Sequence, residues 1–499
     1  MADHNFDVVI LGGGSGGYAA ALRSAQLGKT VALIEKDKLG GTCLHRGCIP
    51  TKALLHSAEV ADVTREAGQF GVVAQFGSID MTQVNKYRDG IVDRLFKGLT
   101  GLVTSKNITV VSGEGRLVGP RTVSVNGDNY TGTDVILATG SYSRSLPGLE
   151  IGGRVITSET ALQLDFVPNK VIVLGGGVIG VEFASIWKSF GADVTIVEGL
   201  PHLVPNEDES VSKALERAFR KRGIDFKLGV RFAGVEQHET GVIVSLEDGT
   251  RLEAELMLVA VGRGPNTAGM GYEEQGVAMD RGFVLTNERL QTNLPNVYAA
   301  GDIVPGLQLA HRGFAQGIFI AEQIAGLNPA IIDETGIPKV TYCEPEVASV
   351  GLSEAKAKEI RATINTEIFN RAQAASAETA AATLTQREMQ TSFSKAVEQT
   401  VSAYPFLDST KPEANAEAIA EVVEWRDFII AKGESPAVAL QKAAGKVAPL
   451  YAAKSEPTPP AVDTRKQKAV EVAAKTANAQ PPSVEAGVGN RSIPLGDDL

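Results

Sequence analysis

Cysteine is scarce in this chain, with three residues among 499, and histidine is nearly as scarce, with six. Three cysteines exclude a disulfide-stabilised scaffold, so a close pair is more typical of a catalytic or metal-binding site. No apolar run approaches the roughly 20 residues that span a bilayer, and the first residues, MADHNFDVVILGG, lack the pattern of a secretory leader. We therefore expect a cytoplasmic protein that does not enter the membrane.

The chain also lacks an excess of positive charge. Its formal net charge is -11 and it has no basic cluster, which argues against nucleic acid as the main partner. Apolar residues make up 43% and charged residues 21%, which is typical of a soluble globular protein. The length predicts several domains.

Glycine, by contrast, is placed in a recognisable pattern. An apolar run from Phe6 leads into Gly12-x-Gly14-x-x-Gly17, and the next apolar run ends at Glu35. This spacing predicts a β-α-β unit that binds a dinucleotide. Gly12 permits the tight turn, Gly14 lets the backbone approach a pyrophosphate, and Gly17 lets helix and strand pack closely. The helix N-terminus would face the phosphates and Glu35 would accept the ribose hydroxyls.

The same unit recurs with each matching position 163 residues later. Its glycines are Gly175, Gly177 and Gly180, and its acid is Glu198. One glycine pattern is a weak signal, but two copies with strand, helix and acid at matching spacing predict two bound dinucleotides. Glycine, leucine and proline follow Glu198 in place of arginine. This suits a free 2′-hydroxyl, so we expect NAD rather than NADP at the second site.

Two of the three cysteines, Cys43 and Cys48, lie close together in GGTCLHRGCIPTK. Five residues of regular helix rise about 7.5 Å, beyond the roughly 7 Å limit on Cα separation in a disulfide. A bridge therefore needs a bent backbone, which Gly47 would permit, and a strained bridge is easily reduced, as a catalytic disulfide should be. The alternatives are two buried structural thiols or a zinc site, for which only His45 is a nearby further ligand.

The segment GGTCLHRGCIPTKALLHSAE resembles the redox-disulfide motif of the flavoprotein disulfide reductases, most closely that of the branch that oxidises dihydrolipoamide. The resemblance covers residues 6–360 and implies FAD and NAD as cofactors. It implies that Cys43 exchanges with the substrate dithiol and that Cys48 contacts the flavin. It also implies that Lys52 and Glu182 form a pair beside the flavin, where the lysine stabilises negative charge on the reduced ring and the glutamate orients the lysine.

Other segments resemble further cofactor-binding parts of the family. TDVILATGS resembles the crossover from the FAD to the NAD domain, and MLVAVGRGPNT resembles the return. NVYAAGD resembles the second FAD motif, whose aspartate binds the ribityl chain and phosphate, and LQLAHRGFAQG the stretch whose backbone amides reach the pyrimidine end of the flavin. The residues expected to bind the cofactors are, in addition to the two glycine loops, Thr42, Gly115, Thr139, Gly140, Gly262, Arg263, Gly301, Asp302, Leu309, Ala310 and His311.

The resemblance ends where the family continues into an interface domain. In the family this domain builds a two-fold dimer and supplies a His-Pro dipeptide, followed by a glutamate, as the acid/base. None of the six histidines in this sequence lies beyond His311. We therefore expect a different helical region in place of the dimerisation domain, and we do not expect the family homodimer.

Residues 361–499 resemble no family that we can name. They begin with an alanine-rich stretch that can bury little, and Ser435 with Pro436 predicts the start of a later helix. From about residue 454 the composition predicts a disordered tail. Residues 414–432 predict a helix with one apolar face, made by Ile419, Val422, Val423, Ile429 and Ile430.

The predicted fold is α/β, with two Rossmann-like dinucleotide-binding domains followed by an atypical, mainly helical and partly disordered C-terminal region. We place the FAD-binding domain in residues 1–150 with a returning segment in 276–345, and the NAD-binding domain in 151–275. An atypical helical region follows in residues 346–452. The disordered tail is expected in residues 453–499.

The predicted activity is NAD-linked oxidation of dihydrolipoamide, presented on a carrier domain, through FAD and the Cys43–Cys48 disulfide. The missing histidine acid/base leaves an alternative, in which only NADH-dependent reduction of dyes, quinones or oxygen is retained. A third hypothesis is a non-catalytic nucleotide-binding scaffold whose helical tail recruits a partner. We expect no metal site.

Overall fold

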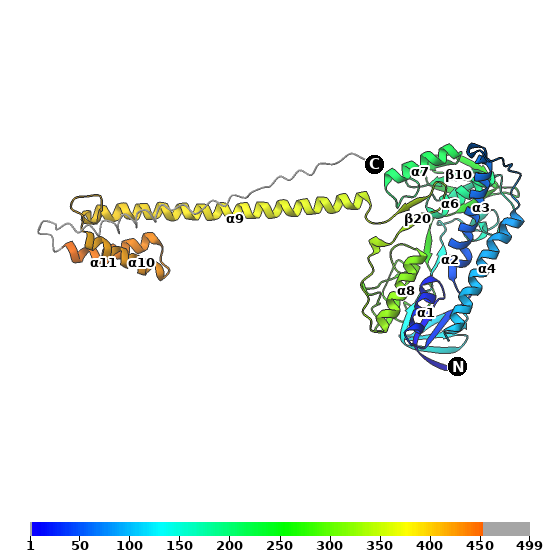
Figure 1. The fold of residues 1–499 in the computed structure, drawn as a ribbon, viewed down its shortest axis with the longest axis horizontal. Helices are drawn as coiled ribbons and strands as arrows, with labels where there is room; N and C mark the ends of the chain where they lie inside the picture. The colour runs from blue at the N-terminus through cyan, green and yellow to red at the C-terminus, as the bar shows by residue number, and fades with distance from the viewer. Residues whose placement is uncertain (1, 453–499) are drawn as a thin grey trace. The chain divides into compact units, whose positions relative to one another are not determined.

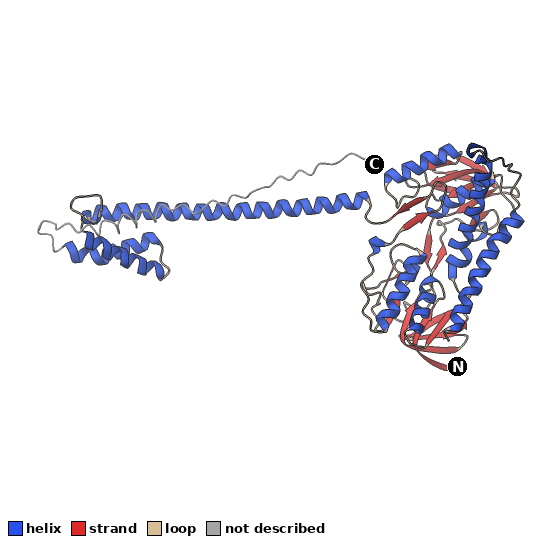
Figure 2. Cartoon of the chain, viewed as in Figure 1, coloured by secondary structure: helices blue, strands red, loops and turns tan. Residues whose placement is uncertain are grey.

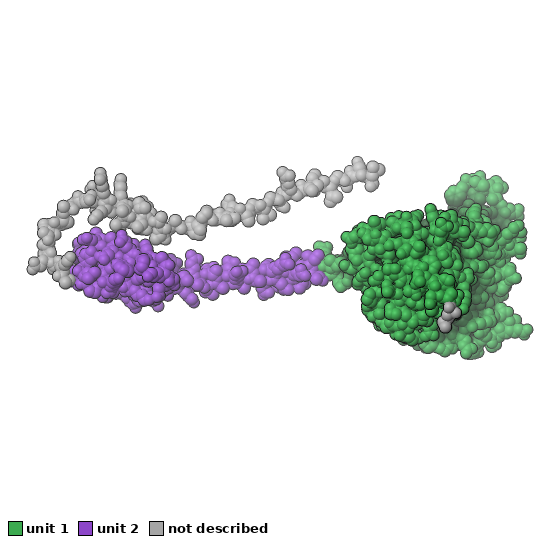
Figure 3. Space-filling view, turned by 90° about the horizontal axis from the view of Figure 1, so that it is seen from below, with its two compact units in different colours: residues 1–362 green, residues 363–499 purple. Residues whose placement is uncertain are grey.

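The computed structural model describes residues 2–452, drawn by chain position in Figure 1 and by secondary structure in Figure 2. The chain divides into two compact units, residues 1–362 and 363–499, shown in green and purple in Figure 3. All of the predicted site residues belong to the first unit. The predicted disordered tail, residues 453–499, lies outside the described residues.

A seven-stranded sheet forms the core of the first part of the chain. The strand order is β3-β2-β1-β6-β5-β4, and β19 pairs with β6. β1 lies parallel to β2 and β6, and its apolar residues from Val8 to Leu11 are buried, as expected for a strand covered on both faces. The strands are β1 (Asp3–Leu11), β2 (Val31–Glu35), β3 (Thr109–Ser112), β4 (Gly115–Gly119), β5 (Thr122–Val125), β6 (Asp128–Leu137) and β19 (Val297–Ala299).

Two helices distant in sequence pack against this sheet and against each other (Figure 1). They are α1 (Ser15–Gln26) and α8 (Ala310–Ile324). Gly317 permits their close approach, because a Cβ there would lie 2.2 Å from the carbonyl oxygen of Gly16. This contact brings the segment around residue 300 to the first glycine-rich loop. The other helices here are α2 (Gly41–Arg46), α3 (Cys48–Glu66) and α4 (Met81–Ser105).

A second sheet contains five parallel strands in the order β11-β10-β9-β15-β8. α6 (Val178–Phe190) is almost entirely buried and packs against α3, with Leu54 of α3 in the same apolar cluster. The helix that follows Cys48 is therefore attached to the second nucleotide-binding unit. The remaining elements are β8 (Val155–Thr157), α5 (Ser158–Ala161), β9 (Lys170–Leu174), β10 (Asp193–Glu198), α7 (Glu209–Arg222), β11 (Asp225–Leu228), β12 (Phe232–Gln237), β13 (Val242–Leu246), β14 (Arg251–Ala254) and β15 (Leu256–Val259).

The two predicted crossovers lie side by side. β7 (Ser141–Ser143) follows the strands of the first sheet in sequence, and β16 (Arg263–Pro265) follows those of the second. The two strands form an antiparallel pair. Met270 and Tyr272, shortly after this pair, already pack into the apolar cluster of the first sheet. We therefore propose that the segment returning to the FAD-binding domain begins near Arg263 rather than at residue 276.

The first unit continues through two short antiparallel pairs. β17 (Met279–Asp280) pairs with β18 (Phe283–Val284), and β20 (Lys339–Thr341) pairs with β21 (Val347–Ser349). The segment between β20 and β21 inserts Cys343, which is fully buried, into the cluster around α6. It thereby attaches the end of this unit to the helix of the second glycine loop.

α9 (Glu354–Ala403) crosses the boundary between the two units in sequence. Every residue of α9 before Phe393 is exposed, which confirms that the alanine-rich stretch buries little. α10 (Ala416–Ala431) and α11 (Pro436–Ala452) pack together with the end of α9 around a small cluster. None of the helices in the described residues has the length and apolar character that crossing a membrane requires.

The predicted helices of the second unit are present, with one correction. Asn415 caps α10 by accepting hydrogen bonds from two backbone amides, and Pro436 begins α11, as predicted. Val423 was expected on the buried face but is exposed. The residues Ile419, Val422 and Ile429 of the predicted face do pack in the cluster, together with Ala418 and Trp425.

Candidate active site

The first glycine-rich loop joins β1 to α1. Gly12 has a φ angle of +108°, and a Cβ there would lie 2.2 Å from the carbonyl oxygen of Ala138. A Cβ on Gly17 would lie 1.8 Å from the carbonyl oxygen of Gly12. Neither position accepts a side chain, so these glycines let α1 begin directly at the end of β1.

The second loop, between β9 and α6, repeats this geometry. Gly175 has a φ angle of +109°, and a Cβ there would lie 2.4 Å from the carbonyl oxygen of Ala260. A Cβ on Gly180 would lie 1.9 Å from the carbonyl oxygen of Gly175. The sequence repeat is therefore also a structural repeat.

The two acids at the ends of β2 and β10 hold their loops in the same way. Oε2 of Glu35 accepts a hydrogen bond from the amide of Gly13, and Oε2 of Glu198 accepts one from Gly176, each at 2.7 Å. The other oxygen of each acid accepts from the amide two residues further along, at 2.8 Å. Burial raises the pKa of Glu35. Each carboxylate lies beside its loop, where it could reach the ribose of a bound dinucleotide.

The middle glycine of each loop leaves space for a ligand. A Cβ on Gly177 would meet nothing within 4 Å, and one on Gly14 would meet only Cα of Gly41, at 3.9 Å. These glycines precede α6 and α1, and no side chain caps either helix N-terminus. Bare backbone beside an uncapped helix N-terminus fits a pyrophosphate. The residues present therefore fit one dinucleotide at each loop.

Asp302 is connected by hydrogen bonds to residues of both crossovers. The hydroxyl of Ser141 donates to Oδ2 of Asp302 at 2.5 Å, and Nε of Arg263 donates to the same hydroxyl at 2.8 Å. Burial lowers the pKa of Arg263, and the neighbouring Asp302 carboxylate opposes that shift. The amide of Gly301 donates to Oε1 of Gln316 at 2.8 Å. The structure thus brings two predicted cofactor residues, Asp302 and Arg263, together through a serine.

Other predicted residues connect the crossovers to each other. The Thr139 hydroxyl donates to the carbonyl oxygen of Asn266 at 2.7 Å, and the Asn266 amide donates to the carbonyl oxygen of Gly140 at 2.8 Å. Gly262 has a φ angle of +101°, and its carbonyl oxygen accepts from the amide of Arg144. These residues define the path of the backbone between the two nucleotide-binding units.

The remaining predicted cofactor residues lie on four elements. Thr42 belongs to α2, and Gly115 is buried in β4 beneath the side chains that end β1 and β2. Leu309 is the N-cap of α8, and Ala310 is its first residue. His311 is exposed, and its Nε2 donates to the carbonyl oxygen of Pro338 at 2.8 Å. The N-terminus of α8 therefore presents backbone amides that could bind a cofactor. The side chain of His311 is instead hydrogen-bonded to Pro338.

Cys43 and Cys48 lie on two consecutive helices. Gly47 separates α2 from α3 with a conformation that is neither helical nor extended (φ −145°, ψ −110°), so the backbone bends between the cysteines as predicted. Both are free thiols. Cys48 is the first residue of α3, where the partial positive charge of the helix N-terminus stabilises a thiolate.

The two thiols differ in acidity. The hydrogen bond from Cys43, together with the charge of Lys52, lowers the pKa of Cys48 to about 7. The same hydrogen bond and burial raise the pKa of Cys43. In the dithiol state the negative charge therefore resides on Cys48, with Cys43 as its hydrogen-bond donor.

Lys52 and Glu182 form the predicted ion pair. Nζ of Lys52 lies 2.8 Å and 3.0 Å from the two carboxylate oxygens of Glu182, whose side chain is buried. The pair joins α3 to α6 four residues after Cys48. It places a fixed cation beside the thiol pair.

His45 does not face the thiols as a free base. Its Nε2 hydrogen-bonds to the carbonyl oxygen of Leu39 at 2.8 Å, and its ring packs edge-on against Phe96 of α4. Within the described residues, no group of three or more histidine, cysteine, aspartate or glutamate side chains could hold a metal ion. The zinc alternative therefore gains no support.

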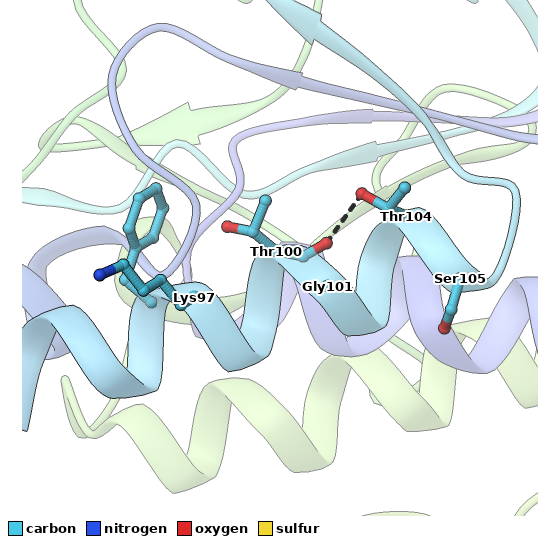
Figure 4. A pocket seen from close by; sticks show the side chains of 6 residues that line it. Lys97, Thr100, Gly101, Thr104 and Ser105 are labelled. Carbon is cyan, nitrogen blue, oxygen red and sulfur yellow. Dashed lines mark hydrogen bonds between the residues drawn. The ribbon is translucent and has the colours of Figure 1, made fainter.

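A surface pocket of about 450 Å³ lies along α4, and its lining includes Phe96, whose ring packs against His45. Figure 4 shows its lining, in which the Thr104 hydroxyl donates to the carbonyl oxygen of Thr100 within the same helix. Only residues of α4 line this pocket. The chemistry therefore lies in the glycine loops and thiols rather than in this hollow.

Sequence patterns did not identify every residue of the site. Ser141 bridges Asp302 and Arg263, and the side chain of Tyr342 lies over Lys52. Ser141 ends the segment TDVILATGS but was not expected to be a site residue, and Tyr342 lies outside the motifs described above. Only the folded chain gives the two residues these positions. Gln316 is fully buried, and its Nε2 has no hydrogen-bond partner among residues 2–452. It lies in a quoted motif, but its contact with Gly301 depends on the packing of α8.

Two nucleotide-binding loops, a thiol pair and a lysine-glutamate pair together define an FAD- and NAD-linked oxidoreductase that works through a redox disulfide. Comparison with known families agrees. The profile of the family described as pyridine nucleotide-disulphide oxidoreductase matches residues 6–317. The chain belongs to this family, whose members use FAD and NAD(H), and it is an oxidoreductase enzyme.

Named relatives refine the comparison. The chain is 45% identical over 372 residues to a dihydrolipoyl dehydrogenase of Bacillus subtilis, covering 71% of this chain and 78% of that protein. It is 41% identical over 372 residues to the mitochondrial dihydrolipoyl dehydrogenase of Pisum sativum, covering 72% and 74%. Among solved structures, LpdA of Mycobacterium tuberculosis aligns with a TM-score of 0.66 at 28% identity, covering 72% of this chain and 80% of that chain.

The comparisons also correct one expectation. The profile of the family's dimerisation domain matches residues 337–409, a range that contains β20, β21 and most of α9. It was therefore wrong to expect that everything after residue 361 is unrelated to the family, and the match indicates the family homodimer. The expectation took the missing histidine as a sign that the whole domain is missing. A domain can keep its relationship to the family while it lacks that residue.

Proposed function

We propose that this chain catalyses the NAD-linked oxidation of dihydrolipoamide, carried on a lipoyl domain of another protein. The Cys43–Cys48 disulfide would accept the two electrons and become a dithiol, and it would form again when the electrons pass to NAD+. The observation that carries this proposal is the position of Cys48 at the N-terminus of α3, one helical turn before the Lys52–Glu182 ion pair. The helix N-terminus and the lysine both favour Cys48 as the thiolate leaving group, which gives the disulfide a direction of attack. The likeness to dihydrolipoyl dehydrogenases supports the choice of substrate.

The direction follows from leaving-group chemistry. In thiol–disulfide exchange, the sulfur with the lower thiol pKa leaves faster. Cys48 has that lower pKa, so a substrate thiolate attacks at Cys43 and releases Cys48 as a thiolate. The second substrate thiol then displaces Cys43, which completes a cyclic disulfide in the substrate and leaves two thiols in the enzyme.

FAD, when bound, would accept the electron pair from the thiols and deliver it to the nicotinamide. The chain's own residues prepare that exchange. Lys52, fixed by Glu182, supplies a positive charge beside Cys48, and the N-terminus of α3 supplies a second positive field. Regeneration of the disulfide by NAD+ releases one NADH and one proton, so electrons and protons balance over the cycle.

The substrate thiol still needs a base. No histidine follows His311 in the sequence, and the ring of His45 is hydrogen-bonded to the carbonyl oxygen of Leu39. This observation favours a second candidate function, in which NADH-dependent reduction of dyes or quinones is fast while dithiol turnover is slow. The two functions use the same nucleotide sites and differ only in the use of Cys43.

The test compares both reactions in one FAD-loaded preparation. Cys43→Ser should abolish dihydrolipoamide oxidation and leave NADH-dependent dye reduction within about twofold, because only the first reaction needs the exchange thiol. Cys343→Ser is the matched control, since it alters a buried cysteine outside the pair. Dihydrolipoamide turnover that survives in Cys43→Ser would refute the proposal.

A further inference from the structure

Besides Glu182, a second residue, Tyr342, holds Lys52, and it lies outside the motifs described above. Besides the two oxygens of Glu182, Nζ of Lys52 lies 4.8 Å from the centroid of the Tyr342 ring. A cation at this distance from an aromatic face is attracted by the negative potential of the ring. Lys52 is only partly buried, with about a third of its side chain exposed, so this ring limits where the ammonium group can move.

The tyrosine is itself fixed to the same glutamate. The amide of Tyr342 donates to Oε1 of Glu182 at 2.9 Å, so one carboxylate oxygen binds both the ammonium group and the backbone beside the ring. Two residues later, the amide of Glu344 donates to Oγ of Ser185 on α6, also at 2.9 Å. The segment is therefore attached to α6 at two points, one helical turn apart.

A second anchor comes from α7. Arg222 donates to the carbonyl oxygen of Glu344 at 2.8 Å and to the hydroxyl of Ser185 at 2.7 Å. Its other terminal nitrogen donates to Asp62 of α3 at 3.0 Å. Cys343 between the two attachment points is fully buried. Backbone and buried contacts thus position the Tyr342 ring, and a change confined to that ring leaves them in place.

We propose that Tyr342 is a positioning residue, whose ring keeps the ammonium group of Lys52 between Glu182 and the thiol of Cys48. Lys52 lies one helical turn after Cys48 on α3, so a lysine released by loss of the ring would extend into solvent. The thiolate would then lose the cation that favours it. The proposal rests on the role assigned to Cys48 under the proposed function, but it concerns the reduced thiols and does not require turnover.

Several charged and titratable groups face the thiol pair, and Tyr342 acts on only one of them. Arg263 and Glu182 interact electrostatically with Cys48, and Tyr18 interacts with Cys43. The Cys48 thiol will therefore still titrate when the ring is removed. Its pKa should change only by the amount that Lys52 contributes to it.

The experiment measures the rate at which iodoacetamide alkylates Cys48 in the reduced protein between pH 5 and pH 10, by peptide mass spectrometry. In Tyr342→Leu, loss of the ring should raise the Cys48 pKa and slow its alkylation at pH 7 by about three- to tenfold. The rates at pH 10 should agree, since the thiol is ionised in both proteins. Tyr342→Phe should retain the unmodified profile because it retains the ring.

Tyr87→Leu is the matched control, because Tyr87 is a tyrosine of similar exposure on α4 (44% against 42%). It should leave the profile unchanged. If Tyr342→Leu does not fold, Tyr342→Met gives the same comparison with another ringless side chain. A Tyr342→Leu profile that superimposes on the unmodified one would overturn the proposal, as would equal shifts in the phenylalanine and leucine variants. Dihydrolipoamide turnover decides the proposed function separately.

Discussion

The ammonium nitrogen of Lys52 lies 2.8 Å from Oε1 of Glu182, although 130 positions separate the two residues in sequence. The pair joins α3, which begins with Cys48, to α6, which begins at the second glycine loop. A single ion pair therefore links the thiols to the nucleotide unit expected to bind NAD. Because Glu182 is buried, removing either partner would leave an uncompensated group at this junction.

The acidity of the thiols gives a prediction about pH. Alkylation of Cys48 in the reduced protein should rise through a midpoint at about pH 7, because its thiolate is the reactive form. Cys43, whose pKa is raised, should react only at a pH above that of an ordinary thiol. Peptide mass spectrometry after timed alkylation separates the two. Equal midpoints near the usual thiol value would contradict the asymmetry.

The two glycine loops should be separable by mutation. Gly17→Ala places a Cβ 1.8 Å from a backbone oxygen, and we expect it to cost at least about 1–3 kcal/mol and to abolish FAD binding. Gly180→Ala creates the same clash in the second loop. It should leave the protein yellow but unreactive toward NADH.

The control is Gly90→Ala in α4, where a Cβ would meet nothing within 4 Å. It should leave both nucleotides bound and stabilise the fold by about 0.5–1 kcal/mol, since alanine is the better helix former. Flavin absorbance and thermal melting are the readouts. If Gly17→Ala gave a protein that is yellow but does not react with NADH, the two loops would have been assigned to the wrong nucleotides.

The local part of this architecture was predictable because glycine geometry is local. The spacing around Gly12 and Gly175 predicts both turns, and the structure reproduces them with the same φ angles and the same acid-to-amide bonds. The bend at Gly47 follows from the same reasoning. In these segments, the requirement for glycine is set by backbone atoms a few residues away.

The rest depends on contacts that sequence spacing does not encode. Ser141 and Tyr342 reach the site only because crossovers and strands from distant parts of the chain meet there. Val423 was placed on the wrong face because α11 decides which side of α10 is covered. The relationship of residues 361–409 to the dimerisation domain was missed because the expectation depended on one absent histidine.

The nucleotide preference follows from Glu198. Its carboxylate is held by two backbone amides at the end of β10, so it would repel a 2′-phosphate and accept a 2′-hydroxyl. We expect kcat/KM to be at least about tenfold higher for NADH than for NADPH, the scale of one charged hydrogen bond. Glu198→Arg should reduce or reverse that ratio, whereas Glu253→Arg on the exposed face of β14 should not. Comparable use of both nucleotides by the unmodified protein would refute this assignment.

The missing base predicts a particular rate profile. A positioned general base contributes about 10²–10⁴-fold, and no histidine after His311 can supply one. Dihydrolipoamide turnover at neutral pH should be lower by this factor than in a relative that has the base, and it should increase as the pH approaches the pKa of the substrate thiol. Dye reduction by NADH should lack this steep rise. Full-speed dithiol turnover near pH 7 would show that another group acts as the base, and His45→Ala would then be the first variant to assay.

Electrons from NADH are expected to reach the Cys43–Cys48 disulfide. The most direct measurement adds one equivalent of NADH to the oxidised, FAD-loaded protein without oxygen. The free thiols are then alkylated at an alkaline pH, where Cys43 also reacts, and the labelled peptides are identified. NADH and one proton should convert the disulfide into two thiols, so Cys43 and Cys48 should each gain one alkyl group while buried Cys343 stays unlabelled in the folded protein. Oxidation of NADH with no new label on either Cys43 or Cys48 would contradict the claim.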